Sequence, residues 1–309
     1  MKTNETVQML KILTIYAAGL LIGAVSGFLP LLSLAAGLPV LVVRHQMGLL
    51  QARLMALATL VLTWIILDPL SFVIVSLGIV VGYSLLNWRS SEQGLGIAYR
   101  RSLLGGAIWL AVGNFVAVFI TQRNLLALIN EAMTQSFQLL LEHMTAMDIY
   151  PPEQLEFLQT FQEQAVPIFN QTWPIMAFVF ISLSTTVGLL LLARYEPAVA
   201  YSLANWRELR APAWLAIVTF VAHGLHQLAP NIYPWLVNNV LGIGNFVLFL
   251  FGYALVQFYM RHFRFSRMMG VLFTLYLFLS PWLRPILALV GRFDALFDYR
   301  YYARAKTQS

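Results

Sequence analysis

Apolar runs of about 20 residues recur along most of this chain, and they constrain its fold more than any other feature. A helix needs about 20 mostly apolar residues to cross the hydrocarbon core of a bilayer. Backbone amides find no water there, so each must bond within its own helix or within a closed barrel. Runs of this length favour helices, so the sequence predicts an all-α fold, a polytopic transmembrane helical bundle with eight or nine spans. The runs are Gln8–Phe28, Leu29–Val43, Gly48–Leu67, Leu70–Trp88, Ser102–Thr121, Trp173–Ala193, Pro212–Leu228, Trp235–Tyr259 and a last run from about Met268.

Three of these runs leave the number of crossings open. The first resembles a signal peptide in its Lys2 and Lys11, but its length and poor cleavage context favour a retained span. The second is broken by Pro30, Gly37 and Pro39, which fits either a short tilted span or a re-entrant segment. The last run meets two prolines, and the chain either continues or turns back there.

Composition supports a membrane location. Hydrophobic residues make up 60% of the chain and charged residues 10%, whereas a soluble domain is about 45–50% apolar and about 25% charged. This balance excludes an ordinary soluble enzyme, a disordered chain and a collagen. The absence of cysteine excludes disulfides, cysteine-bound zinc, iron–sulfur clusters and thiol catalysis.

The charge distribution predicts the orientation in a bacterial cell (inner) membrane. Lys and Arg outnumber Asp and Glu by 19 to 13, and the basic residues lie beside apolar runs, which favours contact with lipid headgroups over nucleic acid. The basic loops are Arg89 to Arg101, Arg194 to Arg210 and Arg261 to Arg267. Placing them in the cytoplasm puts the amino terminus inside. The basic tail favours a cytoplasmic carboxyl terminus, although nine crossings would place it outside.

Residues 122–172 form the one sizeable polar interval, and their Glu and Asp residues place it outside the cell. Apolar residues recur there every three or four positions, which predicts an amphipathic helix. Pro151–Pro152 breaks the chain and can begin a second helix. We expect a helical hairpin that caps the bundle or acts as a mobile lid. The predicted organisation is therefore a membrane bundle over 1–121, this hairpin over 122–172, and a second bundle with a cytoplasmic-side tail over 173–309.

Six polar or aromatic residues fall in the outer half of the predicted spans. Polar groups inside a bilayer are costly and often functional, so a convergent subset would form a small-molecule site. The alternative is separate hydrogen bonds between helices and anchors at the interface. The tentative ligand-binding residues are Trp64, Asp68, Asn114, His223, His226 and Asn245.

The sequence offers no complete catalytic or metal constellation. His223 and His226 are at most half of a metal site, and phosphate-loop, zinc-protease and serine-hydrolase motifs are absent. We therefore expect no enzyme activity, no metal and no cofactor.

Gly19, Gly23 and Gly27 lie on one face of the first predicted span. Such a face lets another helix approach closely, and the partner is either a span of the same chain or another membrane protein subunit. Gly78 and Gly82 are a weaker copy of this pattern.

The carboxyl-terminal sequence from Gly291 to Arg300 reads GRFDALFDYR. Asp294 and Asp298 lie four apart on a helix, and with Arg300 they suit either local ion pairs or docking of a cytosolic partner. The alternative is a solvated helix at the membrane interface.

This ending, the early proline-broken runs and the amphipathic interval resemble the YybS-like bacterial membrane proteins. That family is similar, more distantly, to the substrate-binding S components of energy-coupling-factor vitamin transporters. The resemblance implies a helical bundle that binds a solute from outside and meets a coupling subunit through small residues of its first helix, where Gly19, Gly23 and Gly27 lie. More spans and a long acidic interval distinguish this chain, and no binding residue is carried over.

Two functions follow as expectations. The first is a binding or transport subunit for a small solute in the plasma membrane. The alternative is a non-enzymatic scaffold or regulator that assembles with other envelope or signalling proteins. Recovery of an ATPase pair from native membranes would favour the first.

Overall fold

The computed structural model describes residues 33–67, 69–86, 94–147, 152–280 and 282–301. Every regular element in these ranges is helical, which confirms the predicted all-α class. The chain divides into two compact units, Met1–Ala200 and Tyr201–Ser309, whereas the sequence-based boundaries lie at 121 and 172.

The first unit contains α3 (Leu38–Met47), α4 (Leu49–Ile66), α5 (Pro69–Leu85), α6 (Leu95–Thr121), α7 (Leu125–Met147), α8 (Pro152–Leu192) and the first half of the boundary helix α9 (Pro197–Ala204). Prolines begin α5, α8 and α9, where their fixed φ suits a first helical turn and no amide bond is lost. Helix α5 supplies much of the core, with Val75, Ile79 and Val81 nearly inaccessible. It packs against α3, α4, α6 and α8.

Helices α3 and α5 meet at glycines. A methyl group on Gly37 would lie 2.5 Å from the carbonyl oxygen of Gly78 and 2.9 Å from the Cα of Gly82. The predicted packing role of Gly78 and Gly82 is thus realised within the chain. Gly19, Gly23 and Gly27 lie outside the described residues, so their role stays a prediction.

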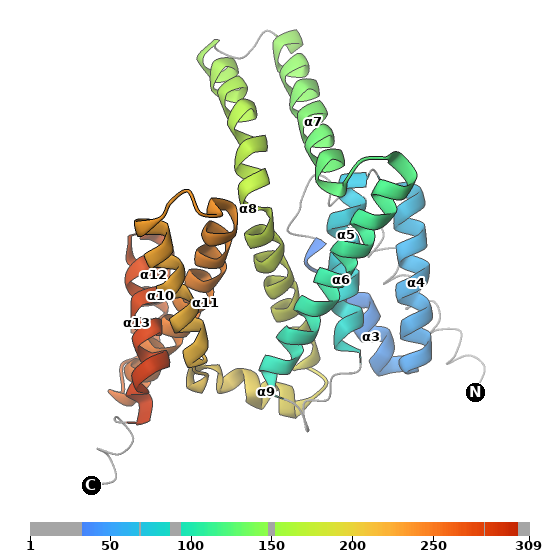
Figure 1. Ribbon diagram of the computed structural model, residues 1–309. Coiled ribbons are helices and arrows are strands. Elements are labelled where there is room, and N and C mark those ends of the chain that lie inside the picture. The colour runs from blue at the N-terminus through green and yellow to red at the C-terminus, as the bar shows by residue number, and fades with distance from the viewer. Residues whose placement is uncertain (1–32, 68, 87–93, 148–151, 281, 302–309) are drawn as a thin grey trace, which may run out of the picture. The chain divides into compact units, whose positions relative to one another are not determined.

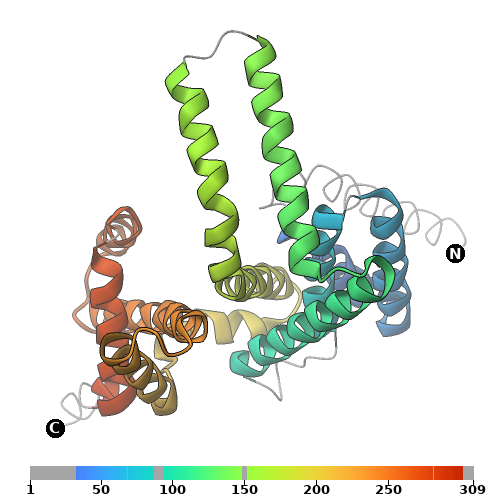
Figure 2. The same cartoon turned by 45° about the horizontal axis from the view of Figure 1, so that its top comes forward.

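The predicted amphipathic interval forms α7 and the first part of α8, which lie side by side in Figures 1 and 2. Asn130 donates to Asn170 at 2.9 Å, and Phe137 packs edge-on against Phe161. The sequence predicted a hairpin over 122–172 followed by a separate span, but the second helix does not stop between them. Helix α8 continues for 41 residues through Pro167 and Pro174, because a helix can keep its path past a proline at the cost of a lost bond and a bend.

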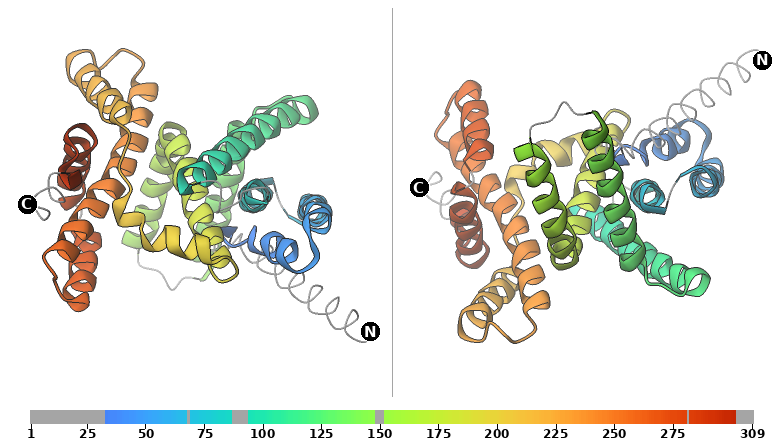
Figure 3. Two further views of the ribbon diagram at one scale, coloured as in Figure 1. Left: turned by 90° about the horizontal axis from the view of Figure 1, so that it is seen from below. Right: turned by 90° about the horizontal axis from the view of Figure 1, so that it is seen from above.

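The second unit contains the short turn η1 (Trp206–Glu208), α10 (Ala213–Leu228), α11 (Pro234–His262), α12 (Arg267–Leu279) and α13 (Leu283–Phe297). Figure 3 shows α11 as its long helix, with α13 beside it. The two helices cross at Gly252 and Gly291, where an added methyl group would overlap backbone atoms of the other helix. Leu248, Ala216 and Ala288 fill the core where α10, α11 and α13 meet.

Among the described residues, four helical stretches are long and apolar enough to cross a membrane: Leu49–Ile66, Leu95–Thr121, Leu155–Leu192 and Pro234–His262. Shorter apolar helices cover Phe72–Leu85, Ala213–Leu228 and Met268–Leu277. The outward faces of α4 and α6 carry large exposed apolar side chains, such as Ile65 at 71% and Phe119 at 77%. Lipid contact accounts for such surfaces.

Candidate functional site

The tentative ligand-binding residues of the first unit each have a local role. Trp64 is exposed and packs edge-on against Phe72, with ring centroids 4.9 Å apart. The side-chain oxygen of Asn114 accepts from the backbone amide of Leu125 at 3.0 Å, so it satisfies one of the free amides at the start of α7. Asp68 lies outside the described residues.

The tentative residues of the second unit lie on two helices. His223 and His226 are exposed on α10. Asn245 of α11 accepts a hydrogen bond from Arg292 of α13, whose guanidinium also lies 5.2 Å from the centroid of the Phe220 ring. The described residues contain no group of three His, Cys, Asp or Glu side chains placed to hold a metal. A common site for the six predicted residues stays a prediction.

The carboxyl-terminal motif is folded against its own unit. Asp294 and Arg300 form an ion pair and are 0% and 3% exposed. Asp298 pairs instead with Arg210 at 2.8 Å, and the hydroxyl of Tyr259 donates to the backbone oxygen of Tyr299 at 3.0 Å. Docking of a cytosolic partner by Asp294, Asp298 and Arg300 stays a prediction, and in this structure two of these side chains are inaccessible.

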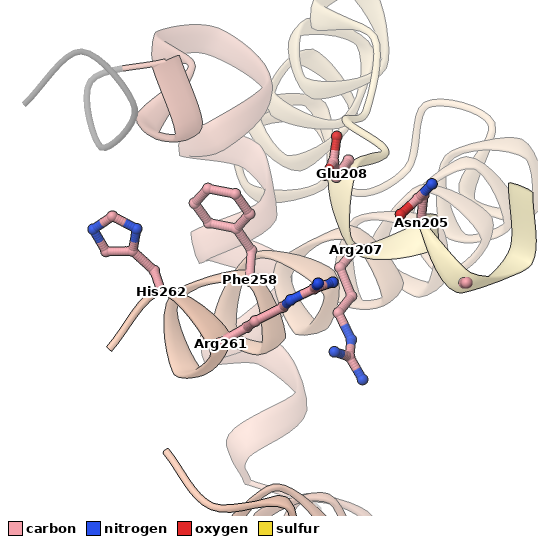
Figure 4. A pocket seen from close by; sticks show the side chains of 7 residues that line it. Asn205, Arg207, Glu208, Phe258, Arg261 and His262 are labelled. Atoms are coloured by element: carbon pink, nitrogen blue, oxygen red, sulfur yellow. The ribbon is translucent and has the colours of Figure 1, made fainter. Parts of the chain in front are cut away.

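A polar pocket of about 340 Å³ lies in the second unit, between η1 and the last turns of α11. Figure 4 shows its side chains, with Arg207 and Glu208 leaving the η1 turn in opposite directions. The lining residues are Ala204, Asn205, Arg207, Glu208, Phe258, Arg261 and His262. A hollow of this size, with donors and one aromatic side chain, matches the lower end of small-molecule sites.

Contacts on both sides of the turn fix the wall that carries Arg207. Trp206 stacks on Tyr253 of α11, with ring centroids 5.4 Å apart. The Tyr253 hydroxyl is 2.6 Å from the hydroxyl of Thr274 on α12. The stacked pair therefore joins η1 to two helices.

Arg210 holds the other end of the turn. Its guanidinium donates to the carbonyl oxygens of Asp294 at 3.0 Å and Ala295 at 2.7 Å, and to the carboxylate of Asp298 at 2.8 Å. The last carbonyls of a helix lack partners within the helix, and a cation there also offsets the helix dipole. Arg210 thus caps α13 and positions the wall of the pocket.

The pocket is lined by two arginines and one carboxylate, that of Glu208. Within the part of the chain that the structure describes, neither Arg207 nor Arg261 forms an ion pair. The Nε of Arg207 is buried and has no hydrogen-bond partner among the described residues. His262 stacks at 6.2 Å on Phe258, one turn earlier on α11. The arrangement can therefore donate several hydrogen bonds to an anion.

In the sequence these residues are recognisable only as members of the basic loops that orient the chain. Nothing in the sequence indicates that the loop before α10 lies beside the end of α11. The available signals were Trp206–Arg207 and Arg261–His262, two places where a cation adjoins an aromatic ring at the edge of a span. Which aromatic residues stack depends on tertiary packing, so the pocket itself was not predictable.

No curated protein and no solved structure matches this sequence. A family model described as "Predicted membrane protein (DUF2232)" matches residues 14–295, which end two residues before the end of α13. The four candidate membrane spans, the two glycine crossings and the pocket residues therefore lie within the matched region, and Asp298 and Arg300 lie beyond it. Because the match covers most of its length, the chain belongs to the DUF2232 family of predicted membrane proteins.

Proposed function

We propose that this protein is a non-catalytic binding or transport subunit for a small solute in a bacterial cell membrane. The pocket lined by Arg207, Phe258 and Arg261 carries this proposal, because it combines a small-molecule volume with unpaired donors on a fixed helical frame. The distant resemblance of the sequence to S components of energy-coupling-factor transporters supports the same role.

The side of the membrane follows from charge. The pocket adjoins the Arg194 to Arg210 and Arg261 to Arg267 loops, which the Lys and Arg bias places in the cytoplasm. It would then be the inner end of a solute path. The tentative ligand-binding residues of the second unit, His223, His226 and Asn245, do not line the pocket.

A ligand screen tests the proposal directly. The purified chain in detergent or nanodiscs would be heated with anionic, neutral and cationic solutes and with metal ions, because a ligand that binds the folded state raises its stability by mass action. We expect at least one solute class to raise the melting temperature in a saturable way. A flat response to every class would contradict a solute-binding role and favour a membrane scaffold instead.

A further inference from the structure

We propose that the pocket between η1 and the end of α11 binds a phosphate group, either of a soluble phosphate ester or of a lipid headgroup. This inference rests on the proposed solute-binding role and specifies its ligand class. It starts from the two guanidinium groups of Arg207 and Arg261, which come from different elements and line one hollow.

The charges around the hollow favour an anion. Two guanidinium groups and one carboxylate, that of Glu208, line the hollow, and neither arginine has an acidic partner among the described residues. The Nε of Arg207 is buried and does not open onto the hollow, so the terminal nitrogens of the two guanidinium groups are the donors available to a ligand.

The geometry of the donors favours phosphate over carboxylate. A guanidinium presents a planar fork that binds two oxygens at once, so one arginine already occupies both oxygens of a carboxylate. Here a second arginine, His262 and Asn205 also line the hollow, from its two walls. A phosphate monoester has three terminal oxygens and about −1.5 to −2 charges, and so it can bond to groups from both walls.

A purely structural role explains only part of the site. Arg261 and His262 lie in the last turn of α11, where a cation interacts favourably with the helix dipole. Arg207 does not lie at that helix end, and yet its side chain lines the same hollow with its Nε unsatisfied. The dipole interaction therefore does not account for Arg207.

The experiment uses the full chain in nanodiscs and measures binding by calorimetry and thermal shift. Glycerol 3-phosphate and inorganic phosphate would be titrated in discs of zwitterionic lipid, with succinate as the carboxylate probe. A second set of discs would contain about one third phosphatidic acid, whose headgroup is a phosphate monoester carried by a lipid. The variants are Arg207→Gln and Arg261→Gln. Arg264→Gln is the matched control, because this exposed arginine lies in the same loop and does not line the pocket.

We expect the phosphate ester to bind the wild type, and each pocket variant to bind at least about tenfold more weakly, a loss of one strong charge-assisted contact. Arg264→Gln should stay within about twofold, because only long-range charge is lost. If only the phosphatidic acid discs stabilise the protein, and the pocket variants abolish that effect while the control keeps it, the phosphate is that of a lipid.

Three results would overturn the inference: equal binding of succinate and phosphate, equal loss in all three variants, or no response to phosphate in either lipid. The proposed function can hold even where this inference fails. A non-phosphate solute that binds the wild type and both pocket variants alike would leave a solute-binding subunit whose site and ligand lie elsewhere.

Discussion

The two units bury their polar groups in different ways. In the first unit, the side-chain contacts between helices are mostly neutral, and the hydroxyls of Ser76 and Thr186 also bond to their own helix. The exception is Arg44, which donates to the backbone oxygen of Leu85 at 3.1 Å. In the second unit, charged groups lie between the helices. The neutral contacts are Tyr99 with Thr186, Trp109 with Ser76, and Ser184 with the backbone of Leu34, whereas the charged ones are Arg300 with Asp294, Arg292 with Asn245, and Arg210 with the end of α13.

The difference decides how each unit should respond to substitution. A hydroxyl that loses its partner across a helix interface can still bond to a carbonyl of its own helix. A buried charge has no such substitute, and its desolvation cost then stays uncompensated. The second unit should therefore be the more sensitive one, and its sensitivity should be concentrated around the end of α13.

The largest effect is expected at the buried ion pair. Asp294→Asn leaves the guanidinium of Arg300, which is 3% exposed, without its counter-charge. Breaking a buried pair in this way costs about 3–5 kcal/mol. Unfolding in a denaturing detergent, followed by intrinsic tryptophan fluorescence, would measure the loss.

A double replacement separates charge from packing. Asp294→Leu with Arg300→Met removes both charges, and it should recover most of the stability lost in Asp294→Asn, since apolar replacements of buried pairs are often neutral or better. A single variant as stable as the wild type would show that the second unit does not depend on this pair.

The sequence predicted much of the first unit, but little of the pocket and of the ionic contacts around the end of α13 in the second unit. Apolar runs fixed the positions of most helices, because run length and helix rise are set by the bilayer. The start of α8 at Pro152 followed from local chemistry. Its continuation through Pro167 and Pro174 did not, because local preference argues for a break there and packing decides the outcome.

The site was harder to predict, because its residues come from separate loops. Glycines along one sequence segment indicate close packing, but Gly252 and Gly291 meet across 39 positions, and only the structure pairs them. The charged residues of the tail were visible as a motif. Their partner Arg210 lies 84 residues before Asp294 and gave no sign of its role.

The crossing of α11 and α13 provides the second prediction. Gly291→Ala places a methyl group against the backbone of Leu248 and Gly252, and overpacking of this kind costs about 1–3 kcal/mol. Gly224→Ala is the matched control in α10, because a methyl group there meets no atom within 4 Å. The control should gain up to about 1 kcal/mol from better helix propensity. Equal stability of the two variants would argue against a close crossing.

We expect the contacts by which Arg210 caps α13 to stabilise the protein less than the buried ion pair or the close glycine crossing does. Arg210→Gln removes the bonds to two carbonyls and to Asp298, but its side chain is 35% exposed and water can replace part of them. We expect a loss of about 1–2 kcal/mol. Arg264→Gln, in an exposed position of the same unit, is the control and should change stability by less than about 0.5 kcal/mol. Salt would distinguish the two components, because screening weakens the pair with Asp298 and leaves the carbonyl bonds.

The smallest effect is expected in the first unit, and it tests the comparison from the other side. Tyr99→Phe removes the hydroxyl that lies 2.8 Å from the hydroxyl of Thr186. Thr186 also donates to the carbonyl of Ser182, at 2.8 Å, so no buried group is left without a bond. Hydrogen bonds between membrane helices average about 0.6 kcal/mol, and we expect a loss of that size in the same unfolding measurement. A loss as large as that of Asp294→Asn would mean that the neutral contacts of the first unit are as indispensable as the ionic contacts of the second, and the contrast between the units would then lie in their chemistry and not in their energetics.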